Sequence, residues 1–274
     1  MSKYRPIVQP PWKKSYYFRP GCLLPCVANK KTIENDVRNL TIRRDDIFIL
    51  GYVKSGTHWT TSIVEAIVSI DNPEDVVRHS QSVTLEMGPL DHPNLFEVGL
   101  TKDMVPVSGA SVMKKRPLTR PRIMKTHLMP EFMPNAYFEK KPKTIIVTRN
   151  PKDVAVSLFN YHHITKVLEP IKWDNFIREY CNENTEYGSY FQYTIDWAKY
   201  KEEPWTMFIR YEDIKQSPQE YILKIAKFLG KNLTDKQIQE VARVTDFQFM
   251  KTNSVFITEF LMRKGQRLQR KGKD

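Results

Sequence analysis

The chain has 274 residues, 41% of them hydrophobic, which is enough for one large α/β domain or two small ones with a buried core. No apolar run approaches the ~18 residues of a transmembrane helix, so a membrane span is not expected. Lys and Arg (43) outnumber Asp and Glu (31), and the formal net charge of +12 favours an anionic ligand without identifying it.

The N-terminal stretch MSKYRPIVQPPWKKSYY is basic, rich in proline and aromatic residues, and lacks the apolar core of a secretory signal. The three cysteines, Cys22, Cys26 and Cys181, are a low and odd number, which argues against a disulfide framework and favours a reducing, cytoplasmic compartment. Cys22 and Cys26 have no second pair of Cys or His at ligand spacing, so no metal site is expected.

The apolar run 47–50 predicts a buried strand that leads into the sequence GYVKSGTHW at 51–59. After it, apolar residues recur at helical spacing until Asn72 and Pro73 end the pattern. A strand, a loop of small residues and a helix start can hold an anion, because the loop N–H groups and the positive end of the helix point to one place.

This loop differs from that of nucleoside-triphosphate enzymes. Gly51 and Gly56 have the spacing of those loops. However, Thr57 and His58 follow Gly56 where Lys and Ser or Thr are expected, and the lysine lies upstream, at Lys54. The sequence therefore predicts a phosphate-binding loop built for a different phosphate ligand.

Further elements alternate along the rest of the chain. Apolar runs that predict buried strands lie at 123–124 with its flanking residues, at 144–148 and at 207–209. Helical patterns lie between or after them, and this alternation is typical of a parallel sheet with crossover helices. Helix boundaries are predicted at Asn150-Pro151 and Ser217-Pro218 (starts), at Gly230 (an end) and at the capping box Thr234–Gln237.

Residues 86–120 contain several Pro and Gly and little periodicity, which favours a binding loop or lid.

Polar residues follow three of the predicted strands. The loop with Lys54 follows the first, Lys125-Thr126-His127 the second, and Arg149 ends the third, eight residues before Ser157. Ligands of open parallel sheets bind beyond the carboxyl ends of the strands. We therefore expect these segments to meet at one site.

Together with Arg263-Lys264-Gly265, these segments resemble the cytosolic sulfotransferases. The resemblance runs from about Arg44 to Gly265 and rests on KSGTHW, PRIMKTHL, TIIVTRNPKDVAVSLFNYHH, YGSYFQYTIDW and FIRYEDIKQSP, which occur in family order. It implies an α/β fold with a single domain over 1–274, a central parallel sheet flanked by helices and a P-loop-kinase-like phosphate-binding loop. Residues 1–28 would be an irregular segment on the substrate side, and 266–274 a basic, disordered tail.

The family moves a sulfuryl group from 3′-phosphoadenosine 5′-phosphosulfate (PAPS) to a hydroxyl or amine and leaves 3′-phosphoadenosine 5′-phosphate (PAP). The resemblance therefore implies PAPS as co-substrate and a small, aromatic or steroid-like acceptor. It makes His127 the general base and lets Lys54 and Lys125 stabilise the transferring group and the leaving phosphate. The implied catalytic residues are His127, Lys54, Lys125 and Ser157. The implied donor-binding residues are Lys54, Ser55, Gly56, Thr57, His58, Trp59, Arg149, Ser157, Tyr211, Thr245, Phe247, Met250, Arg263, Lys264 and Gly265.

Within this set, the resemblance assigns Arg149 and Ser157 to the 3′-phosphate, with residues 263–265 closing over it. Trp59 and Phe247 would enclose the adenine. A transferring sulfuryl group carries less charge than a phosphoryl group, so lysines can stabilise it without Mg²⁺, and no metal is expected.

The chain departs from the family at several places. His58 stands where a small hydroxyl or amide residue is common, but an imidazole can still donate a hydrogen bond. Asp246 is left out of the site because an acid would repel phosphate. The stretch between Met250 and Arg263 is shorter than is typical by about a dozen residues, in a region that tolerates insertions, which favours a more open acceptor pocket. The usual C-terminal dimerisation motif is absent, so we expect a monomer, or a dimer made by another route.

Two other functions remain open. One is a protein that binds a nucleotide or a hydrophobic ligand with reduced turnover. The other is an ATP-dependent kinase, although the missing Lys after Gly56 and the extra basic site argue against it. No RNP-like, helix-turn-helix or zinc-finger pattern occurs, so the expected partner is a small-molecule acceptor and not nucleic acid.

Overall fold

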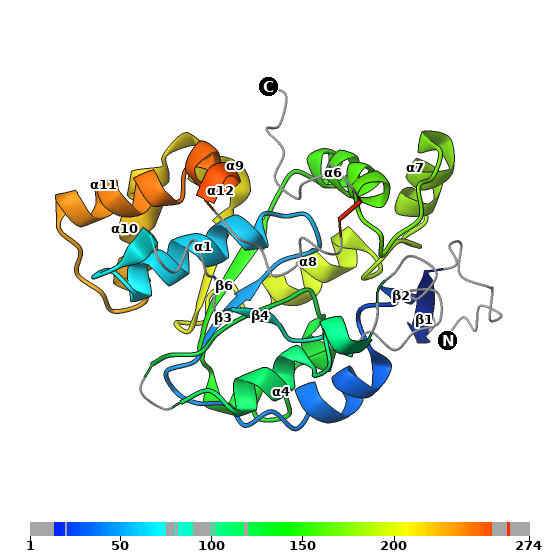
Figure 1. Cartoon of the computed structure of the whole chain (residues 1–274), viewed down its shortest axis with the longest axis horizontal. Coiled ribbons are helices and arrows are strands. Elements are labelled where there is room, and N and C mark those ends of the chain that lie inside the picture. The colour runs from blue at the N-terminus through cyan, green and yellow to red at the C-terminus, as the bar shows by residue number, and fades with distance from the viewer. Residues whose placement is uncertain are drawn as a thin grey trace.

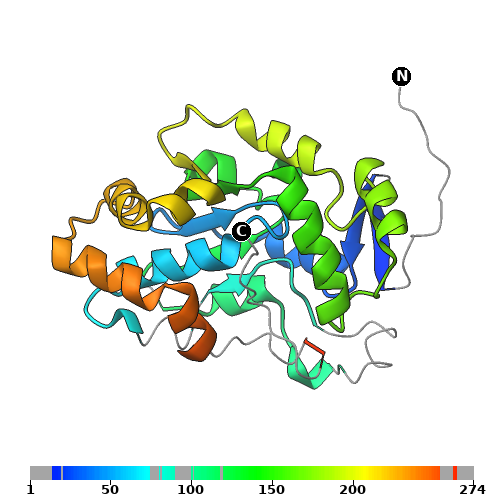
Figure 2. The same ribbon diagram turned by 90° about the horizontal axis from the view of Figure 1, so that it is seen from above.

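The computed structural model describes residues 14–19, 21–74, 80, 82–89, 100, 102–117, 120–253 and 262–263. Through the middle of this part runs a five-stranded sheet in the order β4-β5-β3-β6-β7, with every neighbouring pair parallel. Helices cover both faces of the sheet (Figures 1 and 2). The predicted fold class, an α/β domain with a central parallel sheet flanked by helices, is confirmed.

The strands are β3 (Ile47–Leu50), β4 (Val83–Thr84), β5 (Ile123–Thr126), β6 (Lys143–Thr148) and β7 (Thr206–Arg210). All but β4 were predicted, because a strand buried on both faces gives a continuous apolar run. β4 has only two residues and gives no such run. β3 lies at the centre of the sheet, between β5 and β6, so the loop after it is flanked by the ends of both neighbours.

Successive residues of β3 point to opposite faces, which separates the core into two layers. Ile47 and Ile49 join a cluster with α1 (Thr57–Val68) and with α9 to α12, whereas Phe48 and Leu50 join a cluster with α4 to α8. The remaining helices are α4 (Gly109–Lys114), α5 (Tyr137–Lys140), α6 (Pro151–Ile164), α7 (Trp173–Cys181), α8 (Tyr190–Ala198), α9 (Tyr211–Gln216), α10 (Pro218–Phe228), α11 (Asp235–Val244) and α12 (Phe247–Asn253). The described residues also form a π-helix, η1 (Thr32–Val37), and two 3₁₀ turns, η2 (Lys102–Met104) and η3 (Pro130–Phe132).

The helix boundaries predicted at Asn150, Gly230 and Thr234 are confirmed, whereas α1 ends at Val68, before the expected stop at Asn72 and Pro73. The Asn150 side chain accepts from the Lys152 N–H at 2.9 Å and caps α6. Thr234 and Gln237 form the predicted capping box of α11. Gly230 has φ +73°, a left-handed conformation that suits glycine, and follows the last turn of α10.

Two segments that we expected to be irregular contain regular structure. β1 (Ser15–Arg19) and β2 (Cys22–Pro25) pair as an antiparallel hairpin, which corrects the expectation for residues 1–28. Aromatic residues in β1 and the buried run of β2 favour strands, but a proline-rich context hid them. In the expected loop 86–120, α4 begins after Ser108, whose side chain accepts from the Ser111 N–H at 3.1 Å.

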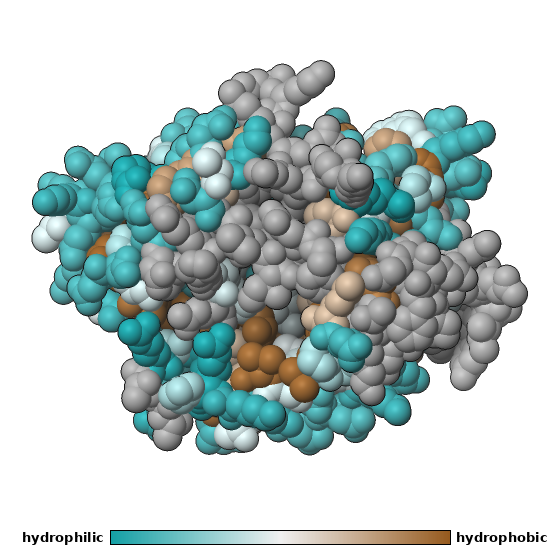
Figure 3. Space-filling view, in the orientation of Figure 1, coloured by the Kyte–Doolittle hydropathy of each residue, from teal (hydrophilic) through white to brown (hydrophobic). Residues whose placement is uncertain are grey.

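Hydrophobic side chains gather between β4 and α4 on the face shown in Figure 3, while hydrophilic ones dominate over α10 and α11. Among the described residues, no helix combines the length and apolar character needed to cross a bilayer.

A buried ion pair holds the amino ends of the two strands that carry the predicted site. Asp46 precedes β3 and Arg122 precedes β5, and both side chains are almost wholly inaccessible. The guanidinium donates through Nε at 2.7 Å and Nη2 at 2.5 Å to the two carboxylate oxygens. It also donates to the carbonyls of Met113 and Thr41. Both carboxylate oxygens and all three guanidinium nitrogens of this pair therefore have protein hydrogen-bond partners.

Replacing Asp46 by Asn should lower the free energy of unfolding by about 3–5 kcal/mol, because the Arg122 charge would stay buried without its counter-charge. Urea denaturation measures this. Lys224→Ala is the matched control, since Lys224 and Glu220 form an exposed pair on α10, whose loss should change little. An Asp46→Asn variant that is as stable as this control would contradict the stabilising role of the buried ion pair.

Candidate active site

The loop after β3 adopts a conformation that places an anion-binding geometry at the carboxyl end of the sheet. Lys54 has φ +69° and Gly56 φ +104°, and α1 begins at Thr57. A Cβ on Gly56 would lie 2.5 Å from Cδ2 of Tyr211, so the glycine is required by both its backbone angle and its neighbour. Because Gly56 has no side chain to cap α1, the first amide groups of this helix can face a ligand.

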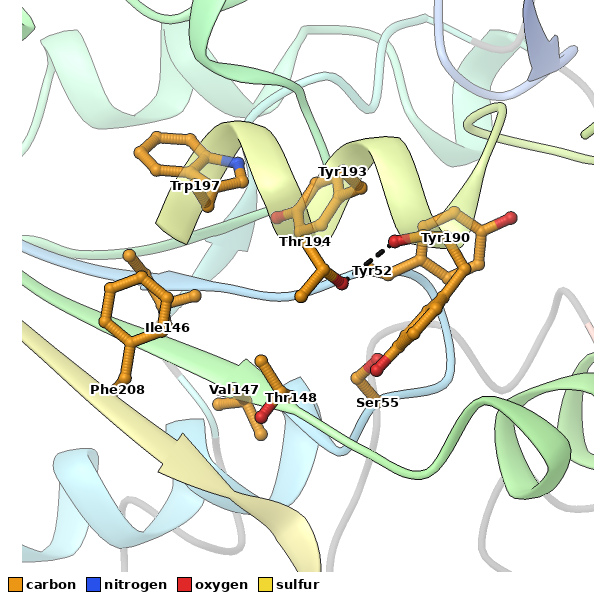
Figure 4. A pocket seen from close by; sticks show the side chains of 10 residues that line it. All are labelled: Tyr52, Ser55, Ile146, Val147, Thr148, Tyr190, Tyr193, Thr194, Trp197 and Phe208. Atoms are coloured by element: carbon orange, nitrogen blue, oxygen red, sulfur yellow. Dashed lines mark hydrogen bonds between the residues drawn. The ribbon is translucent and has the colours of Figure 1, made fainter. Parts of the chain in front are cut away.

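The Ser55 side chain does not face that anion position. Its hydroxyl is buried and makes no hydrogen bond to any described residue. It borders a hollow beneath the loop, where Tyr190, Tyr193 and Trp197 of α8 lie over β6 (Figure 4). The Ser55 N–H donates to the Tyr52 carbonyl at 3.0 Å, which closes the turn. An anion would therefore meet the amides of Gly56 and Thr57 before that of Ser55.

The structure brings the three predicted segments together. The ring of His127, directly after β5, hydrogen-bonds through Nδ1 to the Gly51 carbonyl at 2.7 Å. Arg149, directly after β6, donates through Nη1 to the Lys54 carbonyl at 3.1 Å. The ends of β5 and β6 thus clasp the loop after β3 from both sides.

The contact with Gly51 decides which ring nitrogen of His127 carries the proton. A carbonyl oxygen can only accept, so Nδ1 must be the donor. Nε2 then holds the lone pair of the neutral ring. This is the tautomer that a general base needs, and it is fixed by a backbone group.

The surroundings of His127 favour the neutral form of its ring. Burial lowers the pKa of His127; the negative charge of Glu86 and the Gly51 hydrogen bond oppose this, and Lys125 and Lys54 add to it. Burial also lowers the pKa of Lys125, against the charges of Glu65 and Glu86. The pKa of His58 lies well below its usual value, because of burial first and then of Lys125, Lys54 and His127. The loop is therefore faced by lysines and by two uncharged imidazoles.

α6 supplies a second wall. The Lys54 ammonium lies 4.4 Å from the ring centroid of Tyr161, a cation–π contact. Ser157 lies four residues earlier on the same helix and is half-buried. Residues four apart share a helix face, so Ser157 also faces the loop.

The two predicted arginines lie at opposite ends of α6. The Arg149 guanidinium packs over Tyr211 at 4.4 Å, and its buried Nε has no partner among the described residues. Arg263 instead pairs by its backbone with Ile164 at 2.8 Å and donates from its side chain to the Leu168 carbonyl at 3.1 Å. Different carbonyl groups therefore hold Arg149 and Arg263, and Lys264 and Gly265 lie outside the described part of the chain.

The predicted adenine residues are brought together in part. The Trp59 indole donates to the Thr245 carbonyl at 2.8 Å, and its ring lies edge-on to Tyr211 at 5.6 Å. Phe247 begins α12 and is partly exposed. Met250, by contrast, is buried in the core with α1, α10 and α11, so its side chain packs inside the protein.

Asp246, which was left out of the predicted site, is exposed, and its carboxylate accepts from the Gln248 N–H at 2.7 Å. The acid therefore caps the start of α12, which agrees with its exclusion. In the described residues no group of His, Cys, Asp and Glu is arranged to hold a metal ion.

Sequence reasoning missed two residues beside His127. Glu86 is wholly buried, and its carboxylate accepts from the His127 N–H at 2.9 Å and from the Thr126 hydroxyl at 2.7 Å. Tyr187 lies edge-on to the His127 ring at 5.2 Å, and its N–H donates to Leu23 of the hairpin at 2.7 Å. A carboxylate two residues beyond a strand was the available signal for Glu86, but β4 was too short to be recognised.

Comparisons with known proteins agree with this geometry. The family model described as "Sulfotransferase domain" matches residues 44–274. Sulfotransferase 6B1 of Danio rerio is 31% identical over 239 residues, covering 87% of this chain and 74% of that protein. Sulfotransferase 1B1 of Canis lupus familiaris is 35% identical over 213 residues, covering 77% and 68%.

Solved structures give the same result. Mouse sulfotransferase SULT7A1, crystallised with PAP, superimposes with a TM-score of 0.72 and 26% identity, covering 88% of this chain and 77% of the other. Retinol dehydratase in complex with androsterone and the inactive cofactor PAP gives a TM-score of 0.79 at 25% identity, covering 93% and 81%. The family match over most of the chain shows that this protein belongs to the sulfotransferase family.

Proposed function

We propose that the chain transfers the sulfuryl group of PAPS to a hydroxyl or amine of a small, aromatic or steroid-like acceptor, with His127 as general base. The observation that carries this proposal is the 2.7 Å hydrogen bond between His127 Nδ1 and Gly51. It joins the base to the anion-binding loop and leaves Nε2 as the proton acceptor. The solved relatives that hold PAP support the choice of donor.

The reaction forms one bond and breaks one. The acceptor oxygen attacks the sulfur of PAPS, the bond from sulfur to the bridging oxygen of the 5′-phosphate breaks, and PAP leaves. The acceptor proton moves to Nε2 of His127. Lys54 and Lys125 stabilise the sulfuryl oxygens and the leaving phosphate, and the amides of Gly56 and Thr57 hold that phosphate.

The 3′-phosphate belongs in this proposal to Arg149 and Ser157. The partnerless, buried Nε of Arg149 supports this, because a buried N–H without a partner costs free energy that an anionic ligand would restore. Trp59 and Tyr211 would border the adenine. Arg263 would reach the same phosphate only by leaving its contact with Leu168.

The acceptor side is proposed to be formed near Tyr187 and the N-terminal hairpin. Tyr187 touches both His127 and β2, so a molecule whose oxygen lies at Nε2 would extend toward them. Retinol dehydratase has been solved with androsterone and with retinol, which supports a hydrophobic acceptor here.

Replacing His127 by Ala should lower the turnover number on the order of 10²–10⁴-fold, because the acceptor keeps its proton in the transition state. The affinity for PAP, measured by calorimetry, should stay within about twofold. His163→Ala on the exposed face of α6 is the matched control and should keep both values. Turnover by His127→Ala close to wild type would remove the assigned base.

Replacing Arg149 by Ala should lower the affinity for PAP by about 10- to 100-fold. This corresponds to the ~1.5–3 kcal/mol that a hydrogen bond to a charged group usually contributes. Adenosine 5′-phosphate lacks the 3′-phosphate, so its affinity should fall much less. Arg243→Ala, an exposed arginine on α11, is the control. An equal loss for both nucleotides would place the 3′-phosphate elsewhere.

Donor identity separates the proposal from the two alternative functions. PAP should raise the melting temperature far more than ATP with Mg²⁺ at equal concentration, because a tighter ligand stabilises the folded state more. The opposite order would favour a kinase. A panel of phenols and steroid alcohols with PAPS then tests turnover: strong PAP binding with no product from any acceptor would favour a binding protein.

A further inference from the structure

We infer that Glu86 is a positioning residue for the transfer: its buried carboxylate fixes the segment that carries His127 and supplies the negative charge that faces His127 and Lys125. The inference rests on the proposed role of His127 as base. Glu86 follows β4, the edge strand next to β5, and is wholly inaccessible to solvent.

The carboxylate binds the end of β5 at two successive residues. Oε1 accepts from the His127 N–H at 2.9 Å, and Oε2 accepts from the Thr126 hydroxyl at 2.7 Å. The same Thr126 hydroxyl oxygen accepts from the Leu128 N–H at 3.1 Å. Two consecutive residues are thus bound directly to one acid and the third is bound to the Thr126 hydroxyl, so Glu86 anchors the backbone that carries the His127 side chain.

Glu86 is itself held by its own main chain. Its carbonyl accepts from the Asn29 N–H at 3.2 Å, and the Leu85 N–H before it donates to the Lys125 carbonyl at 3.0 Å. Met87 after it forms a bridge with Ala28. These contacts on both sides of Glu86 hold the backbone that carries the acid.

The ring of His127 has no carboxylate on Nδ1; a neutral carbonyl holds it there. When Nε2 takes the acceptor proton, the ring becomes a cation between two lysines, which is unfavourable. Glu86 is the anion that opposes them: it raises the pKa of His127 against burial, Lys125 and Lys54. Among the described residues, His58 and Tyr187 are further titratable groups near the ring, and Tyr187 also interacts with Glu86.

The Glu86→Gln variant distinguishes two roles of the carboxylate, as a hydrogen-bond acceptor and as a negative charge. Gln keeps an oxygen for the His127 N–H but removes the charge. The acid limb of kcat/KM for the acceptor reports the pKa of the free base. It should move to lower pH by on the order of one unit, because a group that raised this pKa has been lost. The turnover number should fall about tenfold or more, while PAP affinity stays within about twofold.

Thr126→Val is the matched control. It removes one hydrogen bond to the carboxylate and leaves the charge, so the acid limb should stay in place even where the turnover number falls severalfold. If Glu86→Gln does not fold, Glu86→Asp replaces it: the shorter acid keeps its charge but cannot reach both partners. Turnover should then fall about tenfold with the acid limb unmoved.

Two results overturn the inference. One is a Glu86→Gln enzyme with a wild-type acid limb; the other is a Glu86→Asp enzyme with wild-type turnover. The parallel His127→Ala measurement separates this failure from that of the proposed function. Loss of turnover in His127→Ala together with either result removes Glu86 alone, whereas an active His127→Ala removes both.

Discussion

The hydrogen bond from His127 to the Gly51 carbonyl is the constraint on which the site depends. It joins the carboxyl ends of β5 and β3, and it requires the two strands to end at paired positions of the sheet. The parallel register provides this, because Leu50 pairs with Thr126 and the two residues that follow are Gly51 and His127. A shift of one residue in that pairing would separate His127 from the loop. The buried Asp46–Arg122 pair at the other end of the same strands opposes such a shift.

A second constraint is the arrangement of charge. The loop concentrates cationic and amide groups that suit an anion, while burial keeps the imidazoles of His127 and His58 uncharged. A protonated ring at either position would add positive charge near the anion. A protonated His127, however, would have no free lone pair on Nε2 to accept a proton. In the proposed mechanism the two tasks are separate: lysines and helix α1 would bind the anion, and a neutral His127 ring supported by Glu86 would act on the acceptor.

Much of the fold could be predicted from the sequence because its signals are local. The buried strands at 47–50 and 144–148 are continuous apolar runs, and the caps at Asn150 and Thr234 act within three residues. The sequence also predicted that the segments around Lys54, His127 and Arg149 meet, since the carboxyl ends of parallel strands lie at one edge of the sheet. The roles of these residues, in contrast, came from the family resemblance and stay proposals.

The features that escaped prediction depend on long-range contacts. Glu86 meets His127 across 41 positions of sequence, and its one local signal, a place two residues after a strand, was hidden because β4 has only two residues. The hairpin β1–β2 is stabilised by packing, with Leu23 bridging to Glu186, in a stretch whose prolines suggested irregular chain. Met250, which was expected at the nucleotide, packs in the core, and its contact with the nucleotide stays a prediction.

A crystal structure of the protein with PAP and an unreactive phenol is the most direct test of the central claim. The account predicts the 5′-phosphate at the amides of Gly56 and Thr57 and the phenol oxygen about 2.6–3.2 Å from His127 Nε2. A nucleotide bound away from this loop would contradict the account. So would a His127 ring turned so that Nε2, instead of Nδ1, faces Gly51.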